Sequence, residues 1–538
     1  MISSTGFSGS RPAADPYAQH VLARLLDFFA DTTPWPRRLW GVGAVLALRE
    51  AAEAGDWSRM RVLSSGAVSW YLRSLERQLG PDRGLGDAQL RKGLIRLLRS
   101  GLDPESQERR RLIQLIPMIN TSYLATWRRT LDSPKPPSAE HLAQAVASHL
   151  LDCGHSSGQL HRWARWLSGQ QDATLADVLE DAERLAARDD QIFDVLVPFS
   201  SIPDHPALAT HLPEWCPPQQ AAAWFADNGF TEPSRQDGAF RYRVPAKDAV
   251  AAARIVGDRI RRLTGRRSYV RSSQKMLEPT GRVWVANWPT SLPLTPPERG
   301  VIVHALENQR TVYSVKTGDR LDEALELATP LNAGPPASAA AGAWSAIESL
   351  LFHPGDRADG RAVAADRLAD VVACSWPRAE LTALSYQHKL RPRGEDRLAV
   401  RLAGKRSNLW RSVVISRELA SGAKLNLTAP GDIAAAQRMV DLLKAPHEQL
   451  SDVRAVFQGA FRRLYRQRNI VVHGGYTEAI ALDSALRIAA PLVGAGLDRL
   501  MHAQLSGGLD PLDLAARAAN SIELVNDPQG PAPTTLLE

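Results

Sequence analysis

The residues best suited to chemistry lie near the C-terminus, in the stretch LYRQRNIVVHGG at positions 464–475, which holds Arg468, Asn469 and His473. A histidine exchanges protons near neutral pH, and an arginine stays charged and donates two parallel hydrogen bonds to a phosphate. Such a pair can cleave RNA without a metal. A base takes the proton from a 2′-OH, the oxygen attacks the adjacent phosphorus, and a cation steadies the charge on the phosphorane. DNA lacks the 2′-OH, so this chemistry predicts RNA as the only substrate. Asn469 could orient either the phosphate or His473.

The spacing by itself, an Arg followed by four residues and a His, is weak evidence, since 13 histidines in 538 residues make a chance match expected. A second copy runs from Arg299 to His304, in a β-branched stretch that predicts a strand. The copy at 468–473 differs in context. A helix leads into it, Asn469 follows the Arg, and Gly474 and Gly475 are placed to end the element.

The stretch before the motif, positions 447–469, predicts a helix packed on a core. Its apolar residues fall on one face at helical spacing: Val453, Phe457, Ala460, Phe461 and Leu464. Arg468 continues this face, because it lies four residues beyond Leu464. A cation on a buried stripe needs a partner or a ligand.

The stretch RNIVVHGG, positions 468–475, resembles the Arg-(polar)-x-x-x-His signature of the HEPN superfamily, small helical-bundle domains that are often metal-independent ribonucleases in bacterial defence and toxin–antitoxin systems. The stretch AGAWSAIESLLF, positions 341–352, looks like the opening helix of that domain, in which an aromatic and an acidic residue share the inward face. Here Trp344 and Glu348 lie on the apolar side of the expected helix. The resemblance covers roughly positions 341–505 and nothing before them.

The resemblance implies a metal-independent endoribonuclease with Arg468, His473 and Asn469 as catalytic residues and with no cofactor or metal. Glu348 is expected to support the site by pairing with Arg468, and Tyr465 to support it as well. Tyr465 and Arg466 are expected to extend the RNA contact surface. Defence or toxin systems of this kind imply a regulated effector, whose N-terminal region would sense a phage component or a partner protein.

HEPN domains usually assemble composite sites, which implies a homodimer through the C-terminal domain with two motifs facing one RNA strand. A second histidine would supply the acid that faces the base, and a two-fold interface is the commonest way to provide it. The apolar face of the last long helix, expected at 477–505, offers surface for this contact: Leu486, Val493, Leu497 and Leu500.

Without the resemblance, the same residues favour a structural role, in which Arg468 pairs with Glu348 to close the bundle and His473 caps a helix end. Two other functions therefore stay open. One is a noncatalytic RNA-binding or nucleotide-binding HEPN protein, and the other is a helical interaction scaffold.

Composition sets broad limits. Lys and Arg number 65 against 58 acidic residues, giving a net charge of +7, which is compatible with a nucleic-acid partner. Three widely separated cysteines favour neither a disulfide framework nor a Cys-based zinc site. With no secretory signal and no long apolar run, we expect a cytoplasmic protein with no membrane contact.

The chain is predicted to be mainly α with a small α/β middle domain, in successive segments: an N-terminal helical domain (1–132), a second helical block (139–199), a Pro-rich segment and small α/β domain (200–332), a HEPN-like helical bundle (341–510) with an insertion at about 377–446, and a largely disordered tail (511–538). In the first segment, Gly55, Gly80 and Gly101 are placed to end helices. Strands are predicted at 240–245, 282–289, 300–306 and 310–316.

The middle domain also contains the densest basic cluster, which could hold an RNA backbone and stack a base: Arg261, Arg262, Arg266, Arg267 and Tyr269. Cations that complement the C-terminal end of a helix are the alternative explanation for this cluster.

Overall fold

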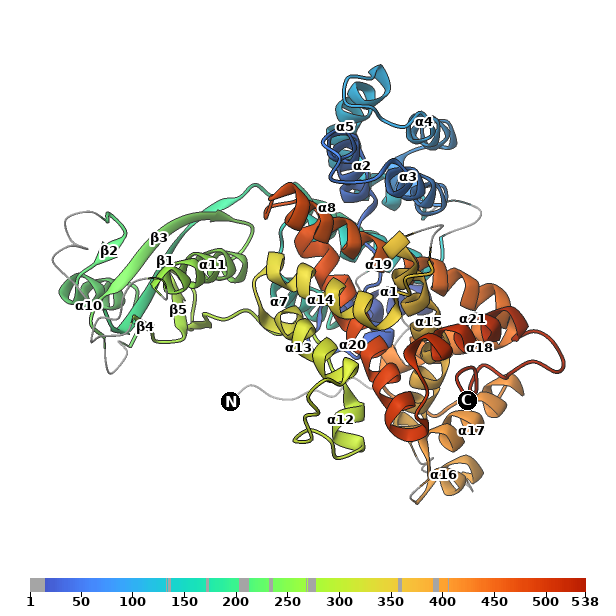
Figure 1. The fold of residues 1–538 in the computed structure, drawn as a ribbon. Coiled ribbons are helices and arrows are strands. Elements are labelled where there is room, and N and C mark those ends of the chain that lie inside the picture. Colours follow the sequence, from blue (N-terminus) through green and yellow to red (C-terminus); the bar gives the residue numbers. More distant parts are fainter. Residues whose placement is uncertain are drawn as a thin grey trace, which may run out of the picture. The chain divides into compact units, whose positions relative to one another are not determined.

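The structure is a computed structural model that describes residues 15–131, 133, 137–170, 174–202, 212–231, 236–267, 269, 277–356, 360–389, 396–404 and 406–538. The protein is mainly helical with one small antiparallel sheet (Figure 1), which confirms the predicted fold class at that level. Its contacts define two compact units. The first comprises residues 1–149, 163–183 and 300–538, and the second comprises residues 150–162 and 184–299. The N-terminal and C-terminal helices therefore share one unit, whereas the sequence predicted them as separate domains.

The first unit begins with five helices: α1 (Pro16–Phe29), α2 (Ala44–Arg59), α3 (Ser65–Leu79), α4 (Ala88–Arg99) and α5 (Gln107–Arg129). Polar side chains at the N-caps of α1, α3, α4 and α5 accept hydrogen bonds from backbone N–H groups. Such caps stabilise the first turn of a helix. Gly80 and Gly101 follow α3 and α4, as predicted. Gly55 does not end a helix. It lies inside α2, where a Cβ would stand 2.3 Å from the Leu102 carbonyl oxygen, so the glycine permits a close backbone approach.

The region 139–199 contains α6 (Ala139–Asp152), α7 (Ser157–Ser168) and α8 (Leu175–Ala187), and it then enters β1 (Gln191–Ser201). The prediction of a purely helical block was therefore wrong at its end. Consecutive residues Val195, Leu196 and Val197 are all buried, because both faces of this strand are covered. A strand buried on both faces shows no alternation of apolar and polar residues, and alternation is the pattern that identifies strands in sequence.

The second unit contains the sheet, made of β1, β2 (Trp215–Cys216), β3 (Ala239–Ala246), β4 (Glu278–Pro279), β5 (Arg282–Val285) and β6 (Leu292–Pro293). The strand order is β2-β3-β1-β5-β6, with β4 also pairing β1, and all of the pairs are antiparallel. Helix α11 (Ala249–Arg267) packs Val256 and Ile260 on the face that holds Val195. Helix α10 (Pro218–Asp227) packs Trp224 on the opposite face, beside Leu196.

Two of the predicted strands are absent. Positions 300–303 are irregular and lead into α12 (His304–Asn308), so the second Arg-to-His copy lies on no strand. Positions 310–316 form turns and irregular structure, and Tyr313 is 98% exposed and Val315 81% exposed. β-Branched and aromatic residues favour a strand only when a sheet surface is available to pack them.

The C-terminal part of the first unit is helical throughout: α13 (Arg320–Ala333), α14 (Pro336–Leu351), α15 (Val363–Gln387), α16 (Arg397–Leu402), α17 (Asn408–Ala420), α18 (Pro430–Lys444), α19 (Pro446–Gly474), α20 (Leu482–Gly507) and α21 (Pro511–Leu524). The stretch 377–446, for which a β-hairpin or more helix stayed open, forms helices joined by loops, and its described residues contain no strand. Helix α19 packs against α14, α15 and α20.

Two expectations about this part were wrong. The segment 511–538 is not a disordered tail, because α21 buries Leu514, Ala518 and Ile522 against the bundle and Leu536 is buried beyond it. The α20 residues proposed for a dimer contact are also buried within the chain, so they leave no apolar face for a second copy: Leu486, Val493, Leu497 and Leu500.

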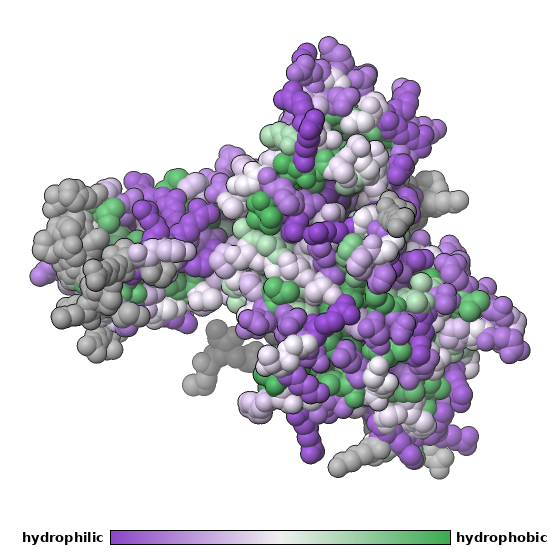
Figure 2. All heavy atoms as spheres, viewed as in Figure 1, coloured by the Kyte–Doolittle hydropathy of each residue, from purple (hydrophilic) through white to green (hydrophobic). Residues whose placement is uncertain are grey.

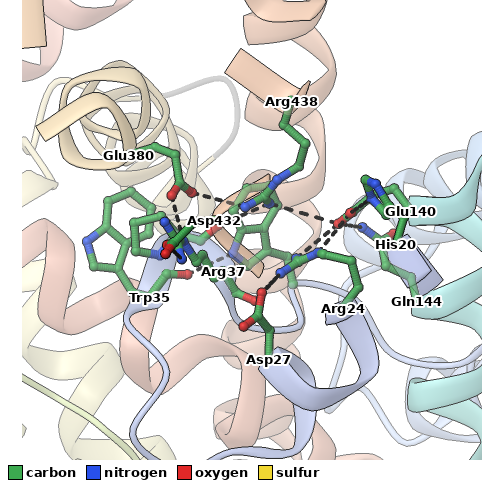
Figure 3. A network of polar contacts seen from close by, with 12 residues as sticks. His20, Arg24, Asp27, Trp35, Arg37, Glu140, Gln144, Glu380, Asp432 and Arg438 are labelled. Atoms are coloured by element: carbon green, nitrogen blue, oxygen red, sulfur yellow. Dashed lines mark hydrogen bonds and ion pairs between the residues drawn. The ribbon is translucent and has the colours of Figure 1, made fainter. Parts of the chain in front are cut away.

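A network of buried charges joins the N-terminal helices to the C-terminal ones (Figure 3). Arg37 donates through Nε to Glu380 (2.7 Å) and through Nη1 to Asp432 (2.6 Å), and Arg438 donates to the other oxygen of Glu380. Arg24, on α1, donates to Glu140 on α6. These bonds fix the segment around Arg37, just after α1, against α15 and α18, and they join α1 to α6. Removing one member of such a network leaves an uncompensated buried charge.

Hydrophilic residues predominate on the face shown in Figure 2. In the part of the chain that the structure describes, no helix has both the length and the apolar composition needed to cross a membrane.

Candidate functional site

The motif lies at the C-terminal end of α19, which runs through it without a break. The helix ends where Gly475 adopts φ = 66° and its N–H donates to the carbonyl of Ile470. A left-handed residue after the last turn is the usual place for glycine, so the predicted role of the glycine pair is confirmed at Gly475. Arg468, Asn469 and His473 therefore occupy the last two turns of one rigid helix.

Arg468 contacts both of the other predicted catalytic residues. Nη1 of Arg468 donates to Oδ1 of Asn469 (2.9 Å) and lies 2.8 Å from Nε2 of His473. Asn469 is buried, Arg468 is half-buried and His473 is exposed. A guanidinium can only donate, so the contact with His473 is a hydrogen bond when Nε2 is the unprotonated ring nitrogen. In that tautomer Nε2 presents its lone pair to Arg468.

This arrangement can exchange partners when an anion arrives. A phosphate oxygen is a stronger acceptor for a guanidinium than a neutral imidazole nitrogen is. An entering phosphate diester would therefore take the donor of Arg468 and leave Nε2 of His473 with a free lone pair. Asn469 holds the guanidinium from the buried side.

The predicted supporting residues lie beside this site but are connected differently from the expectation. The ring of Tyr465 lies 4.4 Å from that of Trp344, whose Nε1 donates to Oε2 of Glu348 (2.8 Å). The other oxygen of Glu348 pairs with Arg361 at 2.7 Å. The expected pairing of Glu348 with Arg468 is therefore wrong, because the indole and Arg361 already occupy the two carboxylate oxygens.

Arg466 is not part of an RNA surface. It is 3% exposed, its Nη2 donates to Oε1 of Glu50 (3.0 Å), and its guanidinium lies 3.7 Å from the ring centre of Tyr71. Glu50 also accepts from Nε of Arg463 (2.8 Å) and from the hydroxyl of Tyr71 (2.8 Å). Burial alone would raise the pKa of Glu50, but the two guanidinium groups outweigh it and hold the pKa at about 2. Helices α2 and α3 thus clamp the motif helix one turn before Arg468.

The turn between α2 and α3 lies against the end of the motif. The ring of Trp57 is 5.6 Å from that of Tyr476. A Cβ on Gly474 would meet Trp57 at 3.3 Å and Val62 at 3.5 Å. No local pattern could have indicated these neighbours, because more than 400 positions separate them from the motif.

The basic cluster lies on α11 in the second unit and just beyond that helix. Arg262 and Arg266 are exposed, Tyr269 is 92% exposed, and Arg261 pairs with Asp258 of the same helix at 2.7 Å. The opposite face of α11 is buried on the sheet. The cluster is therefore accessible, and Arg267, at the end of α11, is half-buried.

The described residues contain no group of three or more His, Cys, Asp and Glu side chains placed to hold a metal ion. No protein-family model, curated protein or solved structure matches this chain.

Proposed function

We propose that the protein is a metal-independent endoribonuclease of the HEPN type, an effector of a bacterial defence or toxin system. The observation that carries the proposal is the 2.8 Å contact between Nη1 of Arg468 and Nε2 of His473 at the end of α19. It unites the group that can bind a phosphate with the group that can take a proton. The resemblance of the motif and of the Trp344 helix to HEPN domains supports the same function.

In the proposed reaction, Arg468 binds a nonbridging phosphate oxygen and His473 takes the proton of the neighbouring 2′-OH through Nε2. The 2′-oxygen attacks phosphorus, the bond to the 5′-oxygen breaks, and the products carry a 2′,3′-cyclic phosphate and a 5′-hydroxyl. Asn469 keeps the guanidinium in place. The departing 5′-oxygen needs a proton from a second acid, which we assign to His473 of a second copy in a homodimer.

The N-terminal region would regulate this effector in response to a phage component or a partner protein. Its helices pack on the motif helix through Glu50 and Trp57. A trigger that moves α2 would therefore alter the surroundings of His473.

The test is to incubate the purified protein with mixed RNA in EDTA beside Arg468→Ala and His473→Ala variants. The chain offers a matched control in its second Arg-to-His copy, through a His304→Ala variant. We expect cleavage by wild type and by His304→Ala, 2′,3′-cyclic phosphate ends, and no cut in DNA. Full cleavage by a pure His473→Ala protein would disprove the assignment.

One observation favours a second candidate, a noncatalytic RNA-binding or nucleotide-binding protein. Nε2 of His473 is occupied by Arg468, as it would be if the imidazole served only to position the guanidinium. In that case the wild type binds RNA but leaves it intact, and Arg468→Ala loses binding while His473→Ala weakens it less.

A further inference from the structure

The turn that joins α2 to α3 is fixed beside the end of the motif. Within it, the backbone N–H groups of Val62 and Leu63 both donate to the carbonyl of Trp57, at 2.9 and 3.2 Å. Trp57 and Val62 in turn lie against Gly474, and Trp57 lies against Tyr476. The turn therefore keeps a defined position next to Gly474 and Tyr476.

Arg61 has an unusual backbone conformation in this turn. Its φ is 57°, in the left-handed region that disfavours residues with a Cβ. The side chain is exposed, and it makes no hydrogen bond or ion pair within the described part of the chain. By contrast, its neighbour Arg59 pairs with Glu105 at 3.1 Å. The left-handed residue closes the end of α2, since the N–H of Arg61 donates to the carbonyl of Ser58 and the N–H of Val62 donates to the carbonyl of Trp57. The exposed guanidinium of Arg61 is left available to a ligand outside the chain.

Tyr476, just after the motif, supplies an aromatic surface next to the end of α2, where Trp57 lies. Its side chain is 46% exposed, although its ring contacts Trp57 at a tilt of 43°. Exposed cations and aromatic rings together bind single-stranded nucleic acid, in which phosphates meet the cations and bases stack on the rings. His473, three residues before Tyr476, is exposed as well.

We infer that Arg61 and Tyr476 form a subsite for single-stranded RNA next to the scissile phosphate, with Arg61 on a backbone phosphate and Tyr476 under a base. This inference rests on the proposed function, since it extends the strand bound at Arg468 and His473. It gives the N-terminal segment a direct part in binding substrate, in addition to the regulatory part proposed above.

The test uses the strain at Arg61. Arg61→Gly removes the cation and also relieves the left-handed conformation, so the variant keeps or gains thermal stability. Arg310 provides a matched control, because it is exposed and has φ = 56° at the end of α12. Arg61→Lys keeps the charge, and Tyr476→Leu removes the ring.

Binding is measured on the full chain by fluorescence anisotropy with an uncleavable 2′-O-methyl single strand, in EDTA and over a range of salt. Loss of one phosphate contact lowers the slope of log affinity against log salt by about 0.7, which is about fivefold weaker binding near 0.1 M salt. We expect this for Arg61→Gly, an unchanged slope for Arg310→Gly and Arg61→Lys, and weaker binding with an unchanged slope for Tyr476→Leu.

The outcomes separate this subsite from the catalytic proposal. If the wild type cuts RNA and Arg61→Gly binds with unchanged affinity and slope, the subsite is overturned and the nuclease stands. If the wild type binds through Arg61 but cuts nothing, the subsite stands and the nuclease falls. A wild type that binds no single strand even at low salt overturns both.

Discussion

Nη1 of Arg468 and Nε2 of His473 are 2.8 Å apart across the last turns of α19. Because both residues belong to one helix, this distance depends on the helix itself and on its end at Gly475. Changes elsewhere in the chain alter the pair chiefly by moving the whole helix.

His473→Ala is expected to lower kcat for RNA cleavage at least ~100-fold, since it removes the proton acceptor. The residue is exposed, so the free energy of unfolding should change by less than ~0.5 kcal/mol. Single-turnover cleavage and chemical denaturation measure the two quantities on the same preparation. A variant that loses activity only in proportion to its stability would argue for a structural role.

Glu50→Gln is expected to destabilise the protein, because Arg463 and Arg466 lose their shared buried anion. The folded-state pKa of about 2 lies below the ordinary value of 4.5. The ionised carboxylate therefore contributes about 3 kcal/mol above pH 4.5. That contribution is lost as the pH falls from 4.5 towards 2, where the unfolded chain binds the proton first.

Unfolding free energies of wild type and Glu50→Gln at several pH values check this prediction. The difference in unfolding free energy between the two proteins should be constant near neutral pH and should decrease below about pH 4.5. An equal gap at every pH would mean that Glu50 acts through packing rather than through charge.

Glu348→Gln is expected to have a small effect, below ~1 kcal/mol, because Arg361 is largely exposed and surface ion pairs contribute little. The glutamine oxygen still accepts the indole N–H of Trp344. Glu348→Ala leaves that buried donor unpaired, at a cost of ~1–3 kcal/mol. The melting temperature and the cleavage rate should both fall in Glu348→Ala. Both should stay near the wild-type values in Glu348→Gln. Loss of all activity in a stable Glu348→Gln protein would instead assign chemistry to Glu348.

The dimer proposal predicts that cleavage depends on protein concentration and that an excess of His473→Ala protein inhibits the wild type, because a mixed dimer has one His473 and lacks either the base or the acid. Mass and cleavage are measured together on the mixtures. A mixture of His473→Ala and Arg468→Ala proteins should stay inactive for the same reason. A strictly monomeric wild type that cuts RNA at full rate would exclude the second His473 as the acid.

The local pattern predicted the motif helix well. The apolar spacing from Val453 to Leu464 identified the buried face of α19, and the glycines at 474 and 475 identified its end. These features depend on residues close in sequence. Arg466 was misassigned for the opposite reason, since its partner Glu50 lies 416 positions away. A basic residue beside a basic motif looks the same in sequence whether it faces solvent or a buried carboxylate.

The buried pairs of the first unit also govern when the protein can fold. Arg37 and Asp432 are 395 positions apart, and Glu50 and Arg463 are 413 positions apart. During translation at ~5–20 residues per second, α2 waits roughly 20–80 s for its partner on α19 to be made. The sheet unit, whose strands all lie within residues 191–293, can fold during that interval. The motif helix gains its clamp only at the end of synthesis, so any activity that needs the clamp starts with a built-in delay after translation begins.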